Sequence, residues 1–155
     1  MRFLEVRSRS IAEVRRRLTG AGYQANLVEA AIDRLVELRM LDDEAFARAW
    51  VESRDRARPR GVIALRRELA LKGIDRSVVD AVLGERDEGS ASAADDEAAV
   101  RLIDRHRRAL ERVADPRLRR QRVYALLARN GFDPEVCARQ AAALFASADE
   151  SAPEA

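Results

Sequence analysis

The sequence predicts an all-α protein of tandem three-helix repeats that form an elongated, curved helical array. Two observations carry this prediction. The 155 residues are 47% apolar but only 5% aromatic, and a chain rich in Ala, Leu, Arg and Glu with few β-branched residues favours helix over sheet. A pattern of apolar residues also recurs around three glycines that can end helices, Gly22, Gly73 and Gly131, which indicates an internal repeat.

The first third of the chain is expected to form three helices, over residues 10–20, 26–39 and 42–58. Apolar side chains recur within each helix at spacings of three and four residues, which places them on one face. On the third helix this stripe is expected to comprise Phe46, Ala49, Trp50 and Ser53. Each helix starts at a polar side chain that can accept a hydrogen bond from a first-turn N–H group. These predicted caps are Ser10, Asn26 and Asp42.

Five further helices are expected over residues 61–71, 75–83, 95–113, 116–129 and 133–146. Residues 84–94 are small and polar and include two glycines, so we expect a flexible linker there. Residues 148–155 have nothing to bury and are expected to form a disordered tail.

The internal repeat emerges when the three glycines are aligned. Each is followed by a large apolar residue: Tyr23, Ile74 and Phe132. The tetrad Asp-Asp-Glu-Ala at 42–45 recurs at 95–98. The predicted domains are repeat 1 (1–57), repeat 2 (58–114) and a two-helix repeat 3 (115–147). Stacked repeats present long surfaces and no deep pocket, so this organisation favours binding over catalysis.

Two features admit a functional and a structural interpretation. The paired carboxylates of the two tetrads could bind a metal ion, but their placement at equivalent helix starts favours capping and interaction with the helix dipole. Phe46 and Trp50 lie four residues apart on one helix face, which favours core packing. Stacking of an exposed Trp50 on nucleobases is the alternative.

Positive charge is concentrated in one part of the chain. The formal net charge is +2, yet residues 54–72 alone carry seven cations and two anions around the elbow Arg58-Pro59-Arg60-Gly61. We expect this cluster to bind an anionic or protein partner, because cations here outnumber nearby anions and adjoin a helix N-terminus. A second cluster lies at the matching junction near residue 117. The candidate partner-binding residues are Arg54, Arg56, Arg58, Arg60, Arg66, Arg67, Lys72, Arg117, Arg119 and Arg120.

Features typical of an enzyme are missing from the sequence. The single histidine, His106, lies among arginines and is expected on the surface, while Cys137 takes a position held by valines in the other repeats and is expected in the core. We find no phosphate-binding glycine loop, no catalytic triad and no metal-ligand spacing, so we expect no cofactor. One cysteine, no long apolar run and no signal peptide predict a cytoplasmic monomer that does not enter a membrane.

Several of these motifs, in this order, resemble the RecX family, bacterial regulators of the RecA recombinase. The resemblance spans roughly residues 3–144. It is carried by Leu41-Asp42-Asp43-Glu44 with Phe46-Ala47, by Arg58-Pro59-Arg60-Gly61, by Arg67-Glu68-Leu69 with Lys72-Gly73-Ile74, and by Leu127-Ala128-Arg129 with Gly131-Phe132. The tandem three-helix repeat is also the architecture of that family.

The resemblance implies a non-enzymatic protein that binds RecA and the RecA–ssDNA filament and inhibits recombinase, ATPase and co-protease activity in DNA repair and the SOS response. It also implies weak direct binding to DNA. The chain departs from the family pattern in its short N-terminus and in Arg120, which stands where the other repeats have Ile11 and Val62. The alternative function is that of a stand-alone helical DNA-binding protein that uses the elbow at 58–61.

Overall fold

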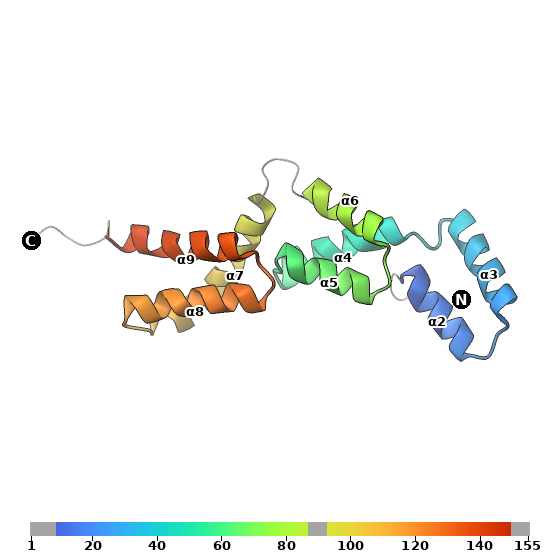
Figure 1. The fold of residues 1–155 in the computed structure, drawn as a ribbon, viewed down its shortest axis with the longest axis horizontal. Coiled ribbons are helices and arrows are strands. Elements are labelled where there is room, and N and C mark those ends of the chain that lie inside the picture. The colour runs from blue at the N-terminus through green and yellow to red at the C-terminus, as the bar shows by residue number, and fades with distance from the viewer. Residues whose placement is uncertain (1–8, 87–92, 150–155) are drawn as a thin grey trace, which may run out of the picture. The chain divides into compact units, whose positions relative to one another are not determined.

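The computed structural model of the chain describes residues 9–86 and 93–149. Within these ranges the chain forms eight α-helices and no β-strand (Figure 1), so the predicted all-α class is confirmed. The helices are α2 (Ile11–Gly20), α3 (Ala25–Glu37), α4 (Asp43–Ala57), α5 (Val62–Leu71), α6 (Arg76–Arg86), α7 (Ala93–Glu111), α8 (Pro116–Arg129) and α9 (Pro134–Asp149).

Most predicted boundaries hold to within a few residues, with two corrections. Asn26 does not cap α3, because the helix begins at Ala25 and its N-cap residue, Gln24, makes no side-chain capping bond. The predicted linker 84–94 is too long, since α6 continues to Arg86 and α7 begins at Ala93. The rest of that linker, 87–92, and most of the predicted tail, 150–155, lie outside the described residues.

The described residues group into two compact units. Unit 1 comprises residues 9–52 and 66–85, and unit 2 comprises 53–65, 86 and 93–149. Helices α4 and α5 each contribute residues to both units.

In unit 1, α2 and α3 pack against each other around a small apolar core. The start of α2 has a complete capping box, in which Ser10 accepts a hydrogen bond from the backbone N–H of Glu13 and the Glu13 carboxylate accepts one from the N–H of Ser10. The capping function predicted for Ser10 is therefore confirmed. The buried residues of this core are Val14, Val28, Ile32 and Leu41.

The inward face of α4 differs from the predicted stripe. Phe46 is buried as expected, but Ala47 and Val51 are buried where Ala49 and Ser53 were predicted, and the latter two are exposed. Alanines at 47 and 49 are equally small and apolar, so the pattern of residue types did not determine which of them faces inward.

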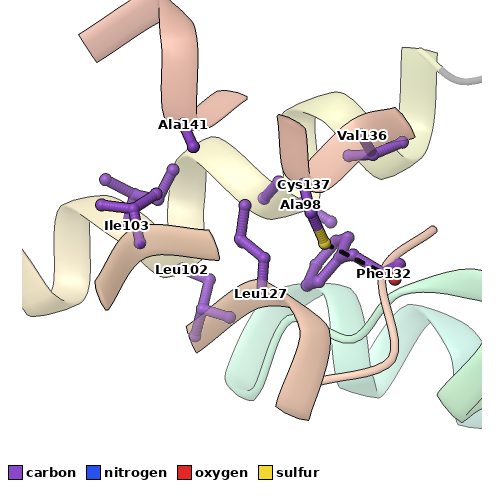
Figure 2. Close-up of a cluster of buried hydrophobic side chains, with 10 residues drawn as sticks. Ala98, Leu102, Ile103, Leu127, Phe132, Val136, Cys137 and Ala141 are labelled. Atoms are coloured by element: carbon purple, nitrogen blue, oxygen red, sulfur yellow. Dashed lines mark hydrogen bonds between the residues drawn. The ribbon is translucent and has the colours of Figure 1, made fainter. Parts of the chain in front are cut away.

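Unit 2 has a larger core formed by α7, α8 and α9 (Figure 2). Cys137 on α9 is fully buried, and its thiol lies 3.6 Å from the carbonyl oxygen of Phe132, which confirms the core position predicted for it. Burial raises the pKa of this thiol, and the charge of Asp133 adds to the shift. The other buried residues of this core are Ala98, Ala99, Leu102, Ile103, Val123, Leu127, Phe132, Val136 and Ala141.

The same packing contact between consecutive first helices of the repeats occurs once in each unit. In unit 1 a Cβ atom built on Gly73 would lie 2.4 Å from the Cβ of Ala12. In unit 2 a Cβ on Gly131 would lie 2.3 Å from the Cβ of Ala64. Each helix-ending glycine therefore fits against the first turn of the helix that begins the preceding repeat. We call these two contacts the repeat junctions.

The repeat is confirmed, but the register of its third helix is shifted by one residue. Asp43 Oδ1 accepts a hydrogen bond from the N–H of Ile11 at 2.8 Å, and Asp95 Oδ2 accepts one from the N–H of Val62 at 3.0 Å. Asp43, and not Asp42, is thus the counterpart of Asp95. Three and four residues after each aspartate come the buried pairs Phe46-Ala47 and Ala98-Ala99.

The two tetrads have the same sequence, so Asp42 was paired with Asp95. Such a match is weak evidence of equivalence, because acidic residues are favoured throughout the first turn of a helix. Asp42 does cap α4, since its carboxylate accepts a hydrogen bond from the N–H of Ala45 at 2.9 Å. In the second tetrad, by contrast, the helix has already begun at Ala93. The carboxylate of Asp95 caps α5 and not its own helix.

Candidate partner-binding surface

The elbow between α4 and α5 is anchored within unit 2. Pro59 and Gly61 are buried, and the N–H of Gly61 donates to the carbonyl oxygen of Asn130 at 3.1 Å. A Cβ atom on Gly61 would lie 2.2 Å from the carbonyl oxygen of Gly131. The elbow therefore requires glycine at 61, because the backbone at the end of α8 fills the place of a side chain.

The two arginines of the elbow differ in their surroundings. Arg58 is exposed, whereas Arg60 is half-buried and donates from Nη1 to Oδ1 of Asn130 at 2.7 Å. Asn130 in turn donates from Nδ2 to the carbonyl oxygen of Leu126 at 2.8 Å. Arg60 thus contributes to the packing of the elbow on α8, and Arg58 is the elbow cation available to a partner.

The end of α4 is held by a side chain from α7. The guanidinium of Arg105 donates to the carbonyl oxygen of Arg56 at 2.9 Å and to that of Ala57. A cation at this position satisfies the last carbonyl groups of the helix and interacts favourably with its dipole. The side chain of Arg56 itself is exposed, and that of Arg54 is half-buried.

The three predicted cations of unit 1 have different environments. Arg66 is exposed and forms an ion pair with Asp80 of α6. Arg67 is exposed as well. Lys72 is half-buried at the repeat junction, where its Nζ lies 2.7 Å from Oε1 of Glu13. Lys72 therefore forms its ion pair with Glu13 within unit 1.

Trp50 belongs to the same junction. Its ring stacks on Phe46 with centroids 5.9 Å apart, its Nε1 donates to Glu68 at 2.9 Å, and the Nζ of Lys72 lies 5.0 Å from its ring centroid. The indole is half-buried by these contacts. This arrangement matches the core-packing interpretation and not that of an exposed stacking platform.

Glu13 is the acidic partner of Lys72. Burial raises the pKa of Glu13, but the hydrogen bond and positive charge of Lys72 outweigh it and lower the pKa below its ordinary value. Its side chain is only 14% exposed, so solvent screens the pair less than it screens a surface ion pair.

On α8, Arg117 and Arg120 are exposed, while Arg119 is half-buried. Arg119 donates from Nε and Nη2 to the carbonyl oxygen of Val113, at 3.0 and 2.8 Å. It therefore fixes the connection between α7 and α8. Tyr124 is 41% exposed and follows Arg117 and Arg120 by seven and four residues, so helix geometry places all three on one face. Sequence reasoning missed Tyr124, although this spacing could have indicated it.

A buried ion-pair cluster in unit 2 was also missed. Arg86 donates to Asp95 at 2.6 Å and to Asp55 at 2.9 and 3.1 Å. The side chains of Arg86 and Asp95 are 7% and 5% exposed. Burial lowers the pKa of Arg86, but its hydrogen bonds to the two aspartates outweigh this effect and raise it. Nothing in the local sequence distinguishes Arg86 from the exposed arginines, because its partners lie 31 and 9 residues away.

The structure thus divides the ten predicted residues into three groups. Arg60, Lys72 and Arg119 make contacts that hold the fold, and Arg54 is half-buried. The exposed ones are Arg56, Arg58, Arg66, Arg67, Arg117 and Arg120. His106, as predicted, is exposed, and its Nδ1 lies 2.9 Å from the carbonyl oxygen of Leu102. None of the described helices is both long enough and apolar enough to cross a lipid bilayer.

Comparisons with known proteins agree on one family. Residues 1–35 match the model of the first three-helix domain of RecX, and residues 42–83 match that of the second. The regulatory protein RecX of Mycobacterium sp. (strain JLS) is 39% identical over 136 residues, which cover 85% of this chain and 72% of that protein. The regulatory protein RecX of Mycolicibacterium smegmatis is 37% identical over 139 residues, which cover 86% and 70%.

A solved structure supports the fold independently. The crystal structure of RecX from Lactobacillus salivarius superposes with a TM-score of 0.74 over 94% of this chain and 91% of that one, at 18% sequence identity. The fold, the repeat and the sequence matches lead to the same conclusion. The chain belongs to the RecX family of regulatory proteins.

Proposed function

We propose that this chain is a non-enzymatic regulator that binds RecA and its nucleoprotein filament on single-stranded DNA and inhibits the ATPase, recombinase and co-protease activities of that filament. The observation that carries the proposal is membership of a family whose relatives are named regulatory proteins. The exposed arginines support it, because a filament of protein and DNA offers acidic side chains and phosphates to them.

Arg58 and Arg67 are the cations that we expect to contribute most. Both are exposed, and Arg58 directly precedes the buried Pro59 of the elbow. A side chain on a fixed backbone loses less conformational freedom on binding than one on a mobile loop. Arg117 and Arg120 of α8 are the further candidates.

The test is a titration of the chain into RecA filaments on single-stranded DNA, with ATP hydrolysis as the readout. Hydrolysis should fall as the chain is added, and the Arg58→Glu/Arg67→Glu variant should require a much higher concentration for the same effect. The matched control, Arg16→Glu/Arg108→Glu, also reverses two exposed arginines, and neither of them is a candidate partner-binding residue. Unchanged hydrolysis at every ratio of wild-type chain to RecA would refute the proposal.

A stand-alone DNA-binding function is the second candidate, and the exposed face of α8 favours it. Arg117 and Arg120 can contact phosphates, and Tyr124 on the same face can stack on a base. Binding to naked DNA should then weaken steeply with salt, because each arginine–phosphate contact releases a counterion. Fluorescence anisotropy across a salt series measures this, and weak, salt-insensitive binding would exclude the second function.

A further inference from the structure

The end of α2 has a surface that is covered in the two later repeats and that no other described residue covers in the first. The glycines that end the first helices of the repeats, Gly22, Gly73 and Gly131, all have positive φ. Gly73 and Gly131 lie against Ala12 and Ala64 at the repeat junctions. Around a Cβ atom built on Gly22, no atom of the described residues lies within 4 Å.

The side chains that follow these glycines show the same contrast. Ile74 and Phe132 are 5% and 2% exposed, whereas their counterpart Tyr23 is 58% exposed. Leu27 is 57% exposed, and its counterpart in the third repeat, Val136, is 3% exposed. The counterpart of Leu27 in the second repeat, Val78, is half-buried. The position of Tyr23 is therefore buried at both repeat junctions, and that of Leu27 is buried at one and half-buried at the other.

The two junctions define what can cover such a surface. In both, the covering element is the first turn of an α-helix. The hydroxyl of Ser10 donates to the carbonyl oxygen of Lys72 at 2.7 Å, and the N–H of Gly61 donates to that of Asn130 at 3.1 Å. The covering turn contains an alanine in each case, Ala12 or Ala64. A larger side chain at that position would keep the covering turn from approaching the glycine.

Electrostatics favours the same arrangement. The carbonyl groups at the end of one helix carry partial negative charge, and the first turn of the covering helix carries partial positive charge. The end of α2 (Figure 1) has the same polarity as the ends of α5 and α8. A helix start is thus complementary to it in shape, in hydrogen bonding and in charge.

We propose that Gly22, Tyr23 and Leu27 form a docking surface, here called the α2-end surface, for the first turn of a helix that belongs to a partner protein. The partner helix has a hydroxyl or N–H donor at its N-cap and alanine within its first turn. This inference goes beyond the proposed function and does not depend on it.

A second copy of this chain fits the α2-end surface poorly. The helix start that would continue the array is that of α8, whose first turn consists of Pro116, Arg117, Leu118 and Arg119. This turn has no alanine, and the guanidinium of Arg119 already caps Val113. Of the described helix starts, those of α2 and α5 already face Gly73 and Gly131, and that of α8 does not match the two covering turns. The occupant that we propose is accordingly the helix of a different protein.

The test uses the full chain and a synthetic helical peptide of about 20 residues, long enough to hold a helix in water, that begins with Ser-Ile-Ala-Glu. NMR amide shifts of the ¹⁵N-labelled chain report where the peptide binds. We expect saturable shifts confined to residues 20–28 at millimolar peptide. A control peptide with leucine in place of the alanine should cause no such shifts. Tyr23→Lys should abolish them, and Leu38→Lys, a change at another exposed apolar residue of unit 1, should not.

Three outcomes would overturn the proposal. The first is the absence of shifts at residues 20–28, or equal shifts with the leucine peptide. The second is a set of NOEs from the Tyr23 ring to residues 1–8, which would identify the chain's own N-terminal residues as the occupant. The third is a concentration dependence of the same shifts without peptide, which would identify a second copy.

Discussion

The repeat junctions predict that glycine-to-alanine substitutions will have very different effects at two positions with similar backbone conformations. Gly22 and Gly131 have φ values of 89° and 77°. Alanine at either position is therefore strained, at a cost of about 1–2 kcal/mol. Only Gly131 faces another helix, since its Cβ would lie 2.3 Å from the Cβ and 2.5 Å from the backbone nitrogen of Ala64.

The magnitude of the difference follows from that distance. Non-bonded carbon atoms are normally about 3.5–4.0 Å apart, so α5 and α8 would have to separate by more than an ångström to admit the methyl group. Overpacking of this kind costs about 1–3 kcal/mol. We therefore expect Gly131→Ala to lower the free energy of unfolding by about 2–5 kcal/mol and Gly22→Ala by about 1–2 kcal/mol.

Urea denaturation followed by circular dichroism measures both values, provided that the slope of each transition stays the same. Ala64→Gly, introduced into the Gly131→Ala variant, removes the methyl group on the other side of the junction. It should recover part of the loss and should have no such effect in the Gly22→Ala variant. Equal destabilisation by the two alanines would refute the view that the end of α8 is packed and the end of α2 is open.

Two ion pairs give further predictions. Asp95→Ala removes one of the two carboxylates that hold the buried Arg86, while the pair with Asp55 remains. It should lower the free energy of unfolding in urea by about 1.5–3 kcal/mol, whereas Asp96→Ala, at a more exposed pair, should cost less than about 1 kcal/mol. A similar loss for both would show that the Arg86 pairs are screened like surface pairs. The pKa of Glu13 is lowered in the fold, so its pairing with Lys72 stabilises the protein above the ordinary glutamate pKa of about 4.3 and is lost as the pH falls through the lower value in the fold. Thermal melts from pH 7 to 3 should therefore show a smaller acid-induced fall in Tm for Glu13→Gln than for wild type, and parallel curves would contradict the assignment.

The helices were predictable because their ends are marked by residues with local effects. The capping side chain of Ser10 and the helix-ending Gly73 act through backbone groups within a few residues. Burial depends on contacts between distant segments, and there the sequence was less informative. It did not distinguish Ala47 from Ala49, and the repeated tetrad suggested Asp42 as the counterpart of Asp95 when the structure assigns that place to Asp43.

The candidate surface was less predictable than the fold for the same reason. The local sequence does not distinguish an arginine that is exposed to solvent from one that contacts another helix. Lys72 contacts Glu13, which is 59 residues away, and Arg60 contacts Asn130, which is 70 residues away. Arg86 could be recognised as a buried cation only once Asp55 was placed beside it.

The four residues of the elbow differ in how much the fold constrains them. Pro59 is buried, and Arg60 and Gly61 contact Asn130 at the end of α8. Arg58 is exposed and has no such constraint. Arg60→Ala removes a charged hydrogen bond to Asn130 and should lower the free energy of unfolding by about 1–3 kcal/mol. Arg58→Ala should change it by less than about 0.5 kcal/mol.

Under the proposed function, inhibition of the RecA filament ATPase should show the reverse order when both variants are assayed well below their melting temperatures. Arg58→Ala should weaken inhibition, and Arg60→Ala should retain it for as long as the elbow stays folded. A stable Arg60→Ala variant that fails to inhibit would place Arg60 in contact with the partner. That result would not require the bond to Asn130 to break, because a guanidinium group carries five N–H donors and the bond to Asn130 Oδ1 at 2.7 Å uses one of them.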